Sequence, residues 1–172
     1  MFEDDFELEP GFADCLRELC MPGMDLPDAV KLHGRRARGQ TMSRLPSGRC
    51  LMRSSSPPIC SVCTLWTIEG SRKMTLRGNS LLRPIDVQTK HWWEMGLDVL
   101  WVAPPPVLDS SALTAASTIG SRKVHGPRAR LRQMSYRVRY AVEREAQYAR
   151  THGLMAWMQS MMPAQPTGRR TP

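Results

Sequence analysis

Residues 126–153 read GPRARLRQMSYRVRYAVEREAQYARTHG and contain no Gly or Pro between Pro127 and Gly153. Proline suits the first position of a helix, and a long stretch free of both residues favours one continuous helix. Apolar residues recur here every three or four positions, which is the helical period: Leu131, Met134, Val138, Ala141, Val142 and Ala149. The sequence therefore predicts a helix over roughly 128–151, with a bend or break at Gly153.

The predicted helix is also basic. Arg130, Arg137 and Arg144 recur every seven residues, and Tyr140 lies among them. Arginines neutralise phosphates and a neighbouring tyrosine stacks on an exposed base, so the pattern is typical of nucleic-acid binding without sequence readout. The alternative is that the arginines form the solvated face of a helix whose apolar stripe packs within the protein. The candidate nucleic-acid-binding residues are Arg130, Arg132, Arg137, Arg139, Tyr140 and Arg144.

Residues after Gly153 carry a second apolar face, formed by Leu154, Trp157, Met158, Met161 and Met162. A basic helix followed by an apolar face with Trp and Met also fits a helix that lies on an anionic membrane surface. We therefore treat 127–162 as one basic amphipathic region and expect a disordered tail over 163–172.

The formal net charge of +8 is unevenly distributed over the 172 residues. Residues 1–30 contain nine acidic residues and one basic residue, whereas residues 31–172 contain 23 basic and seven acidic residues. Opposite charges attract over about a Debye length, ~10 Å. The acidic head therefore either folds back on the basic part of the chain or is solvated independently of it.

The apolar content of the chain is low. Leu, Ile, Val and Phe number 17, 4, 9 and 3, or 33 of 172 residues, a level typical of partly disordered, highly charged chains. No stretch approaches the ~20 apolar residues of a membrane span, and the acidic residues 1–10 do not resemble a secretion signal. We therefore expect neither a secreted protein, nor a membrane-spanning protein, nor a large enzyme.

Arginine dominates the basic residues, since 20 of the 24 are Arg. A GC-rich reading frame produces the same excess without any selection for function. Small accessory proteins of viruses and recently arisen genes are encoded in such frames, so a viral or overlapping-frame origin is one hypothesis for this chain.

The acidic head, residues 1–30, contains one short amphipathic pattern. Its apolar residues fall on one face of a helix that ends before Pro22, and further apolar residues upstream are set among carboxylates. Such a segment either packs on the protein's own core or docks in the groove of a protein partner. The candidate partner-binding residues are Phe2, Phe6, Phe12, Leu16 and Leu19.

Residues 31–58 are rich in Arg, Ser and Pro and show no apolar periodicity, so they are predicted to form an irregular linker. Arg35, Arg36 and Arg38 form a short basic cluster that fits a nuclear import signal. The serines at 54–56 lie between Arg53 and a proline, and are candidates for phosphorylation. A second linker is expected over 109–126.

Residues 59–108 form the most strand-like part of the chain. The stretches 59–69 and 97–103 are rich in β-branched and aromatic residues, which favours strands. A third stretch, 81–87, is predicted as an edge strand because it contains Pro84. Together they predict a small sheet that carries four tryptophans, Trp66, Trp92, Trp93 and Trp101.

The cysteines and histidines do not form a recognisable reactive site. Cys15, Cys20, Cys50, Cys60 and Cys63 are an odd number, which argues against a disulfide framework. Cys60 and Cys63 have the spacing of a metal-binding pair, but a closed zinc site needs four ligands and only Cys50 and a distant His91 could complete it. We therefore predict buried structural cysteines and no metal or other cofactor. The histidines lie in no catalytic motif, so no catalytic residue is nominated and the protein is not expected to be an enzyme.

These patterns predict an α+β chain that is mostly irregular and partly disordered, with a short N-terminal amphipathic helix, a small β-rich middle segment and a longer C-terminal basic helix. They favour a small basic regulatory protein that enters the nucleus, binds RNA or DNA non-specifically and recruits a protein partner through its acidic head. The alternative is a non-enzymatic interaction protein of the cytoplasm or membrane, which docks on a membrane surface or a partner protein through its amphipathic helices.

Overall fold

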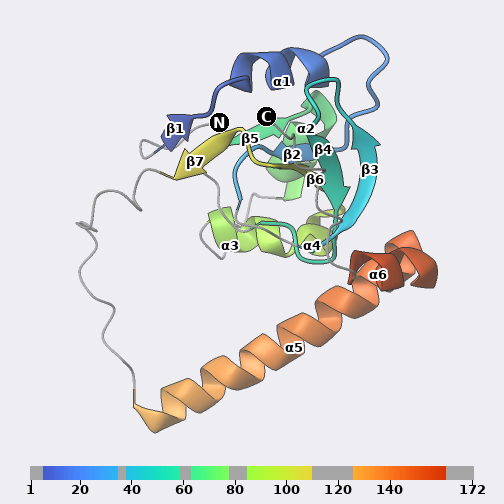
Figure 1. Ribbon diagram of the computed structural model, residues 1–172. Coiled ribbons are helices and arrows are strands. Elements are labelled where there is room, and N and C mark those ends of the chain that lie inside the picture. Colours follow the sequence, from blue (N-terminus) through green and yellow to red (C-terminus); the bar gives the residue numbers. More distant parts are fainter. Residues whose placement is uncertain (1–5, 35–37, 59–62, 78–84, 110–125, 162–172) are drawn as a thin grey trace.

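The computed structural model describes residues 6–34, 38–58, 63–77, 85–109 and 126–161. These residues form an α+β fold with a five-stranded mixed sheet, a two-stranded sheet and six helices (Figure 1). The prediction of a mostly irregular, partly disordered chain is therefore wrong. The Met and Trp residues, together with short buried strands, complete a core for which Leu, Ile, Val and Phe alone are too few.

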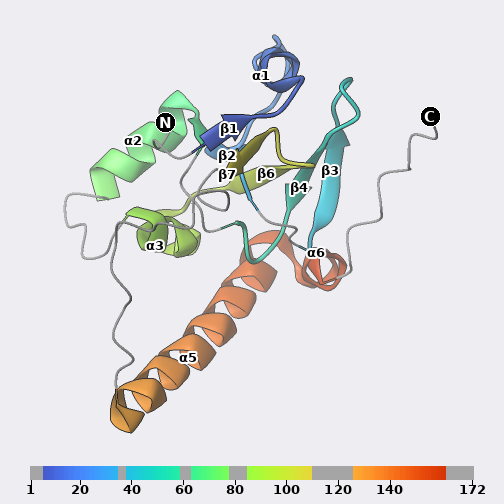
Figure 2. The ribbon, with the colours of Figure 1, turned by 60° about the vertical axis from the view of Figure 1, so that its left-hand side comes forward.

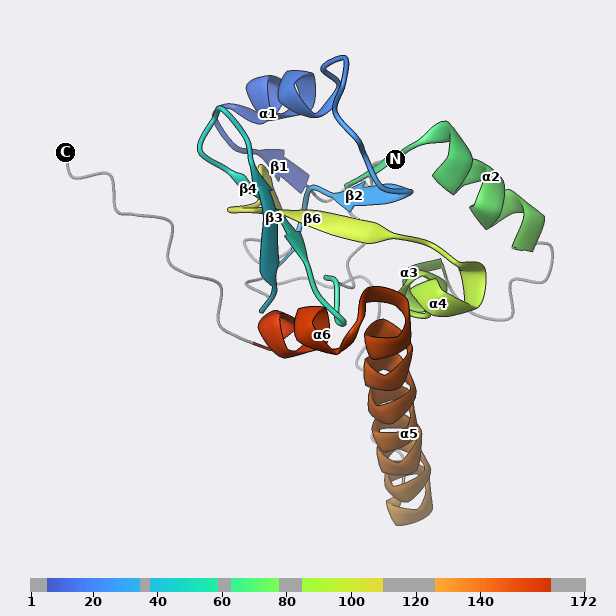
Figure 3. The ribbon, with the colours of Figure 1, turned by 90° about the vertical axis from the view of Figure 1, so that its right-hand side faces the viewer.

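The central strand of the larger sheet is β6 (Val99–Ala103). It pairs in parallel with β2 (Ala29–Lys31) and antiparallel with β4 (Cys50–Arg53). Outside these lie β3 (Gln40–Arg44), next to β4 (Figure 3), and β5 (Thr64–Trp66), next to β2. A strand covered on both faces has a continuous apolar sequence, and β6 reads Val-Leu-Trp-Val-Ala with its first four residues buried. The strand predicted within 97–103 is confirmed.

One face of the sheet is covered by α1 (Phe12–Leu19). Successive residues of a strand point to opposite faces, and Val30, Leu100 and Val102 share a core cluster with Cys15 and Leu19 of α1. Beside this cluster, β1 (Phe6–Leu8) pairs antiparallel with β7 (Val107–Asp109). The predicted N-terminal helix is confirmed, and it packs on the protein's own core.

The opposite face is covered by helices from the second half of the chain. Ala29 and Val99 join a cluster that includes Trp92 and Met95 of α4 (Trp92–Met95) and Tyr148 of α5 (Pro127–His152). The remaining helices are α2 (Ile68–Arg77), α3 (Ile85–Lys90) and α6 (Leu154–Ser160). Gly153 separates α5 from α6 with φ 87°, so the predicted helix and its break are both confirmed.

Two predictions about the middle of the chain are wrong. Residues 31–58, interpreted as an irregular linker, contain β3 and β4. Neither strand shows the alternation by which a strand is recognised in a sequence. β3 is an edge strand with mostly exposed, polar side chains. In β4, Cys50, Leu51 and Met52 are all buried. Residues 85–87, predicted as part of an edge strand, begin α3, since a proline precedes a helix as readily as it limits a strand.

The strand predicted over 59–69 is confirmed only for Thr64–Trp66, because Ile68 already begins α2. Thr67 accepts a hydrogen bond from the amide of Gly70 at 3.1 Å, as the side chain before a helix commonly does. Several sequence-based predictions lie outside the described residues: the strand residues 59–62 and 81–84, the linker residues 110–125 and the tail 163–172.

Candidate functional site: the projecting helix α5

Helix α5 packs on the described part of the protein through its C-terminal half and through the side chains of Tyr136 and Tyr140, and its N-terminal half projects away from the sheet (Figures 1 and 2). Residues 130–139 are all exposed, whereas Tyr148 is only 1 % exposed. The projecting half carries four large apolar side chains with exposed fractions of 62–69 %: Leu131, Met134, Val138 and Val142. We call these four residues the apolar stripe.

Arginines flank the apolar stripe on both sides. A helix turns by about 100° per residue, which places the stripe residues within one narrow sector. On the same wheel Arg130 and Arg137 lie roughly a quarter turn to one side, and Arg132 and Arg139 roughly a quarter turn to the other. Four of the five nominated arginines therefore form two rows, with the apolar stripe between them.

The charge of the projecting half is not neutralised by acids nearby. Residues 126–142 contain no Asp or Glu. Arg139 donates to Glu143 at 2.8 Å, and this hydrogen bond raises the pKa of the guanidinium, but its side chain is 80 % exposed. Within the described part of the chain, Arg130, Arg132 and Arg137 form no ion pair. Three of the nominated arginines are thus open to an anionic partner, and the fourth is held only by an exposed pair.

The structure places Tyr140 and Arg144 differently from the rest of the nominated set. The hydroxyl of Tyr140 donates to the carbonyl of Lys90 at 3.2 Å, and its ring lies 4.9 Å from that of His91 and 5.6 Å from that of Trp93. Burial raises the pKa of this hydroxyl. The guanidinium of Arg144 lies 5.5 Å from the Tyr140 ring centre and pairs with Glu145 at 2.5 Å. Because these contacts join α5 to α3 and α4, Tyr140 is not free to stack on a base.

Glu145 joins the base of α5 to two other segments. One carboxylate oxygen accepts from the hydroxyl of Ser55 at 2.9 Å, and the other accepts from the indole nitrogen of Trp157 at 2.8 Å. These contacts connect α5 to the segment after β4 and to α6. Sequence reasoning did not single out Glu145, although an acid next to an arginine in a basic helix is a weak signal for such a role.

Tyr136 is a further aromatic residue that the sequence analysis did not nominate. Its ring is 50 % exposed and stacks on that of Tyr140, with an interplanar angle of 24°. Its hydroxyl lies 3.0 Å from Nε2 of His91. The spacing of Tyr136 and Tyr140, one helical turn apart, is the signal from which this pair could have been predicted.

The nominated partner-binding residues of the head are used within the protein. Leu19 is fully buried, and Phe6, Phe12 and Leu16 pack against the same core cluster. This face is thus packed on the protein's own core, and its role as a surface for a protein partner stays a prediction. Phe2, Arg35 and Arg36 lie outside the described residues, and Arg38 is exposed.

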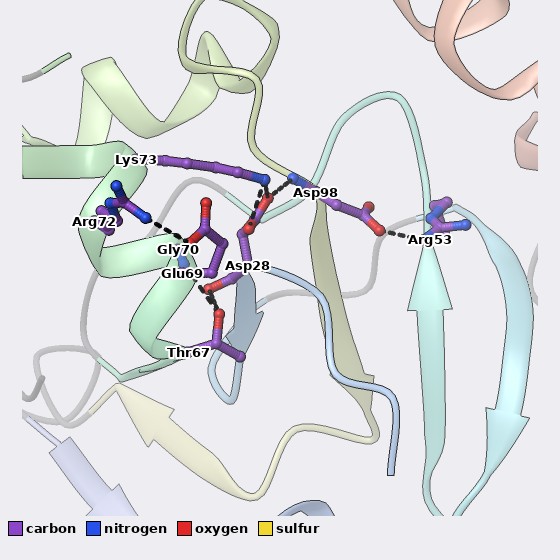
Figure 4. A network of polar contacts seen from close by, with 8 residues as sticks. All are labelled: Asp28, Arg53, Thr67, Glu69, Gly70, Arg72, Lys73 and Asp98. Carbon is purple, nitrogen blue, oxygen red and sulfur yellow. Dashed lines mark hydrogen bonds and ion pairs between the residues drawn. The ribbon is translucent and has the colours of Figure 1, made fainter. Parts of the chain in front are cut away.

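A polar network fixes the start of β2 and β6 (Figure 4). Asp28 accepts two hydrogen bonds from Lys73, at 2.9 and 2.8 Å, and one from the backbone amide of Asp98 at 2.7 Å. Asp98 in turn accepts from Arg53 at 2.5 Å. Each carboxylate thus has a cationic partner within the protein. The network ties α2 to the residue before β2, and it ties β4 to the residue before β6.

Three of the four described cysteines are buried, as predicted, and one is not. Cys15, Cys50 and Cys63 are buried, and Cys20 is exposed. Burial raises the pKa of the Cys63 thiol to about 11 and raises that of Cys15 as well. Among the described residues no three His, Cys, Asp or Glu side chains are grouped to hold a metal ion, and Cys60 lies outside them.

None of the helices in the described ranges is both long and apolar enough to cross a membrane. No known protein family, curated protein or solved structure matches this chain.

Proposed function

We propose that this chain is an interaction protein that binds a partner protein through the apolar stripe of α5. The observation that carries the proposal is the exposure of 62–69 % of four large apolar side chains on one face of a projecting helix. Scattered exposed apolar residues are normal, but a contiguous row of them on an otherwise charged helix is typical of an interaction surface.

The charge around the stripe indicates the chemistry of the partner. Arginines lie on both sides and no acid lies within 126–142, so a complementary segment carries apolar residues flanked by Asp or Glu. An acidic amphipathic helix has this arrangement and pairs with such a face. A second copy of α5 is a poor occupant, because it would bring rows of arginines close to rows of arginines.

The size of the stripe sets the length of the partner segment. Leu131 and Val142 are eleven residues apart, which corresponds to about 17 Å along a helix. A partner helix with roughly 12 residues in contact spans this distance. Full burial of these exposed leucine, methionine and valine side chains gains about 1–2 kcal/mol each, and this gain works against the free-energy cost of association.

The test uses a fluorescent synthetic helix of about 18 residues, with Leu at the heptad a and d positions and Glu at e and g. Full-length protein is titrated into this peptide and into a version with Lys in place of Glu. We expect anisotropy to report binding of the Glu peptide only. The double variant Leu131→Gln/Val138→Gln lowers the affinity by a factor of ten or more.

The matched control is Leu76→Gln, an equally exposed leucine on α2, which leaves the affinity unchanged. Equal binding of both peptides, or full binding by the stripe variant, contradicts the proposal. Binding to anionic vesicles that is abolished by Leu154→Gln/Met158→Gln, a change at two exposed residues of α6, with no binding of the Glu peptide, shows that the helices dock on a membrane instead.

Non-specific nucleic-acid binding is the second candidate, and the exposure of Arg130, Arg132 and Arg137 favours it. With Tyr140 held inside the protein, this binding is electrostatic, without base stacking by Tyr140. About three neutralised phosphates give a slope of about −2 in log affinity against log salt for a single strand. A labelled oligouridine titrated between ~50 and ~200 mM salt checks this slope. Binding unaffected by Arg130→Gln/Arg132→Gln/Arg137→Gln contradicts this candidate.

A nuclear location is part of this second candidate. Arg35, Arg36 and Arg38 are the proposed import signal. A fluorescent fusion of the full chain is expected in the nucleus, and Arg35→Ala/Arg36→Ala/Arg38→Ala is expected to stay outside it. A wild-type fusion that does not enter the nucleus contradicts the proposal, while leaving the docking function of α5 untouched.

A further inference from the structure

A small cavity lies beneath the base of α5, between α4, the end of β4 and the start of β6. Its walls are formed by Arg53, Ser54, Pro57, Trp92, Asp98, Val99, Tyr148 and His152. The cavity measures about 10 Å³, which is the lower limit for holding one water molecule. It is therefore too small for a metabolite or a peptide side chain.

Three polar atoms on the residues that line this cavity have no partner within the described protein. They are Nε of Arg53, the hydroxyl of Ser54 and the hydroxyl of Tyr148. Ser54 is 5 % exposed and Tyr148 is 1 % exposed. Buried polar groups without a hydrogen bond are costly and rare in native proteins, so three such groups on residues that line one cavity are the basis for a shared ligand.

We propose that this cavity is a site for one bound water molecule, which links the end of β4 to the base of α5. Water satisfies all three groups at once. It accepts hydrogen bonds from Nε–H of Arg53 and from the hydroxyl of Tyr148, and it donates one to the hydroxyl oxygen of Ser54. Three partners is the usual number for a buried water.

Chloride is the other small ligand that three donors could hold, because each of these groups can donate. The charge of Asp98 argues against chloride. Asp98 also lines the cavity, and its carboxylate accepts a hydrogen bond from Nη2 of Arg53 at 2.5 Å. This pair neutralises the arginine, and His152 is the other lining residue that could carry a positive charge. Burial and the charge of Arg53 lower the pKa of His152, which keeps this imidazole neutral at pH 7. A neutral site with hydroxyl donors and acceptors favours water over an anion.

The first test is a double-mutant cycle on Tyr148→Phe and Ser54→Ala in the full chain, by urea unfolding. If the water links them, each single change raises the unfolding equilibrium constant about fivefold. The double variant then raises it by clearly less than the product, since either change alone breaks the link. If no water is bound, removing an unpaired buried hydroxyl stabilises the protein and the constant falls, which overturns the proposal.

The second test does not depend on stability. A crystal structure of the wild-type protein grown with bromide is expected to show one density peak in the cavity, within roughly 2.7–3.2 Å of all three groups and without anomalous signal. A peak with bromide's anomalous signal overturns the proposal in favour of an anion. A well-ordered cavity without any peak overturns it altogether.

Discussion

Replacement of Glu145 by alanine is the sharpest test of how α5 is held on the protein. The carboxylate of Glu145 accepts hydrogen bonds from Ser55 and Trp157 and pairs with Arg144. Hydrogen bonds to a charged group are worth ~1.5–3 kcal/mol each. The Glu145 side chain is 22 % exposed, so water replaces part of what is lost. We therefore expect Glu145→Ala to lower the free energy of unfolding by about 2–4 kcal/mol.

The assay is urea unfolding followed by tryptophan fluorescence, since Trp157 is itself one of the donors. Glu145→Gln keeps the shape and one acceptor oxygen, so its loss is about half as large. Glu143→Ala is the matched control: it removes an acid two residues away that pairs only with the exposed Arg139, and the urea midpoint stays where it is. If Glu145→Ala unfolds at the wild-type urea concentration, the base of α5 is not held as described.

Three further predictions concern the sheet, the cysteines and pH. A Cβ at Gly70 would lie 2.0 Å from the carbonyl oxygen of Asp28, so Gly70→Ala destabilises by about 3 kcal/mol or more in urea unfolding, whereas Gly126→Ala, with open space around it, is tolerated. At pH 8 Cys20→Ser removes one equivalent of fast-reacting thiol, because Cys20 is exposed. Cys63→Ser removes none, because the Cys63 pKa of about 11 keeps its thiol protonated. Equal losses of reactive thiol in the two variants contradict this difference between the exposed and the buried cysteine. The lowered pKa of His152 means that below about pH 6.5 the unfolded chain binds a proton that the folded one does not. Stability therefore falls as pH drops from 7 to 5, and a His152→Gln variant with the same pH dependence as wild type contradicts this.

Elements with strong local periodicity could be predicted from the sequence. The pattern of α1 and α5 follows the helical repeat over two or more turns, and β6 is a continuous apolar strand, so each is recognisable without its neighbours. β3 and β4 are not recognisable in this way. β4 adopts a strand because β6, from a distant part of the chain, supplies a pairing partner and burial. The exposed strand β3 pairs with β4 in turn.

The candidate site was predictable in composition but not in arrangement. The sequence correctly places Arg130, Arg132 and Arg137 on an exposed helix. It could not show that Tyr140 packs on Trp93, because the two residues are far apart in the chain. Nor could the sequence show whether the apolar stripe is buried within the protein. The amphipathic pattern is the same for a helix packed on its own core and for one that binds a partner.

The acidic head has the same kind of amphipathic pattern, but its apolar face is packed within the protein. Its apolar face and that of α5 are alike in pattern, yet Cys15 and Leu19 are fully buried while the stripe on α5 is open. The difference arises from position: α1 lies over the sheet, whereas the first half of α5 extends beyond it (Figure 2). An exposed apolar face is thus a property of the tertiary structure, and this is why the docking proposal emerges only from it.

The central claim, that the apolar stripe of α5 is the docking surface, is tested most directly by mapping where an acidic amphipathic helix binds. Two-dimensional amide NMR spectra of the full chain are recorded during titration with the Leu/Glu peptide. We expect the signals of residues 130–142 to shift together and saturate, while those of α1 and α2 stay in place. Shifts that gather on another surface, or no shifts at saturating peptide, contradict the claim.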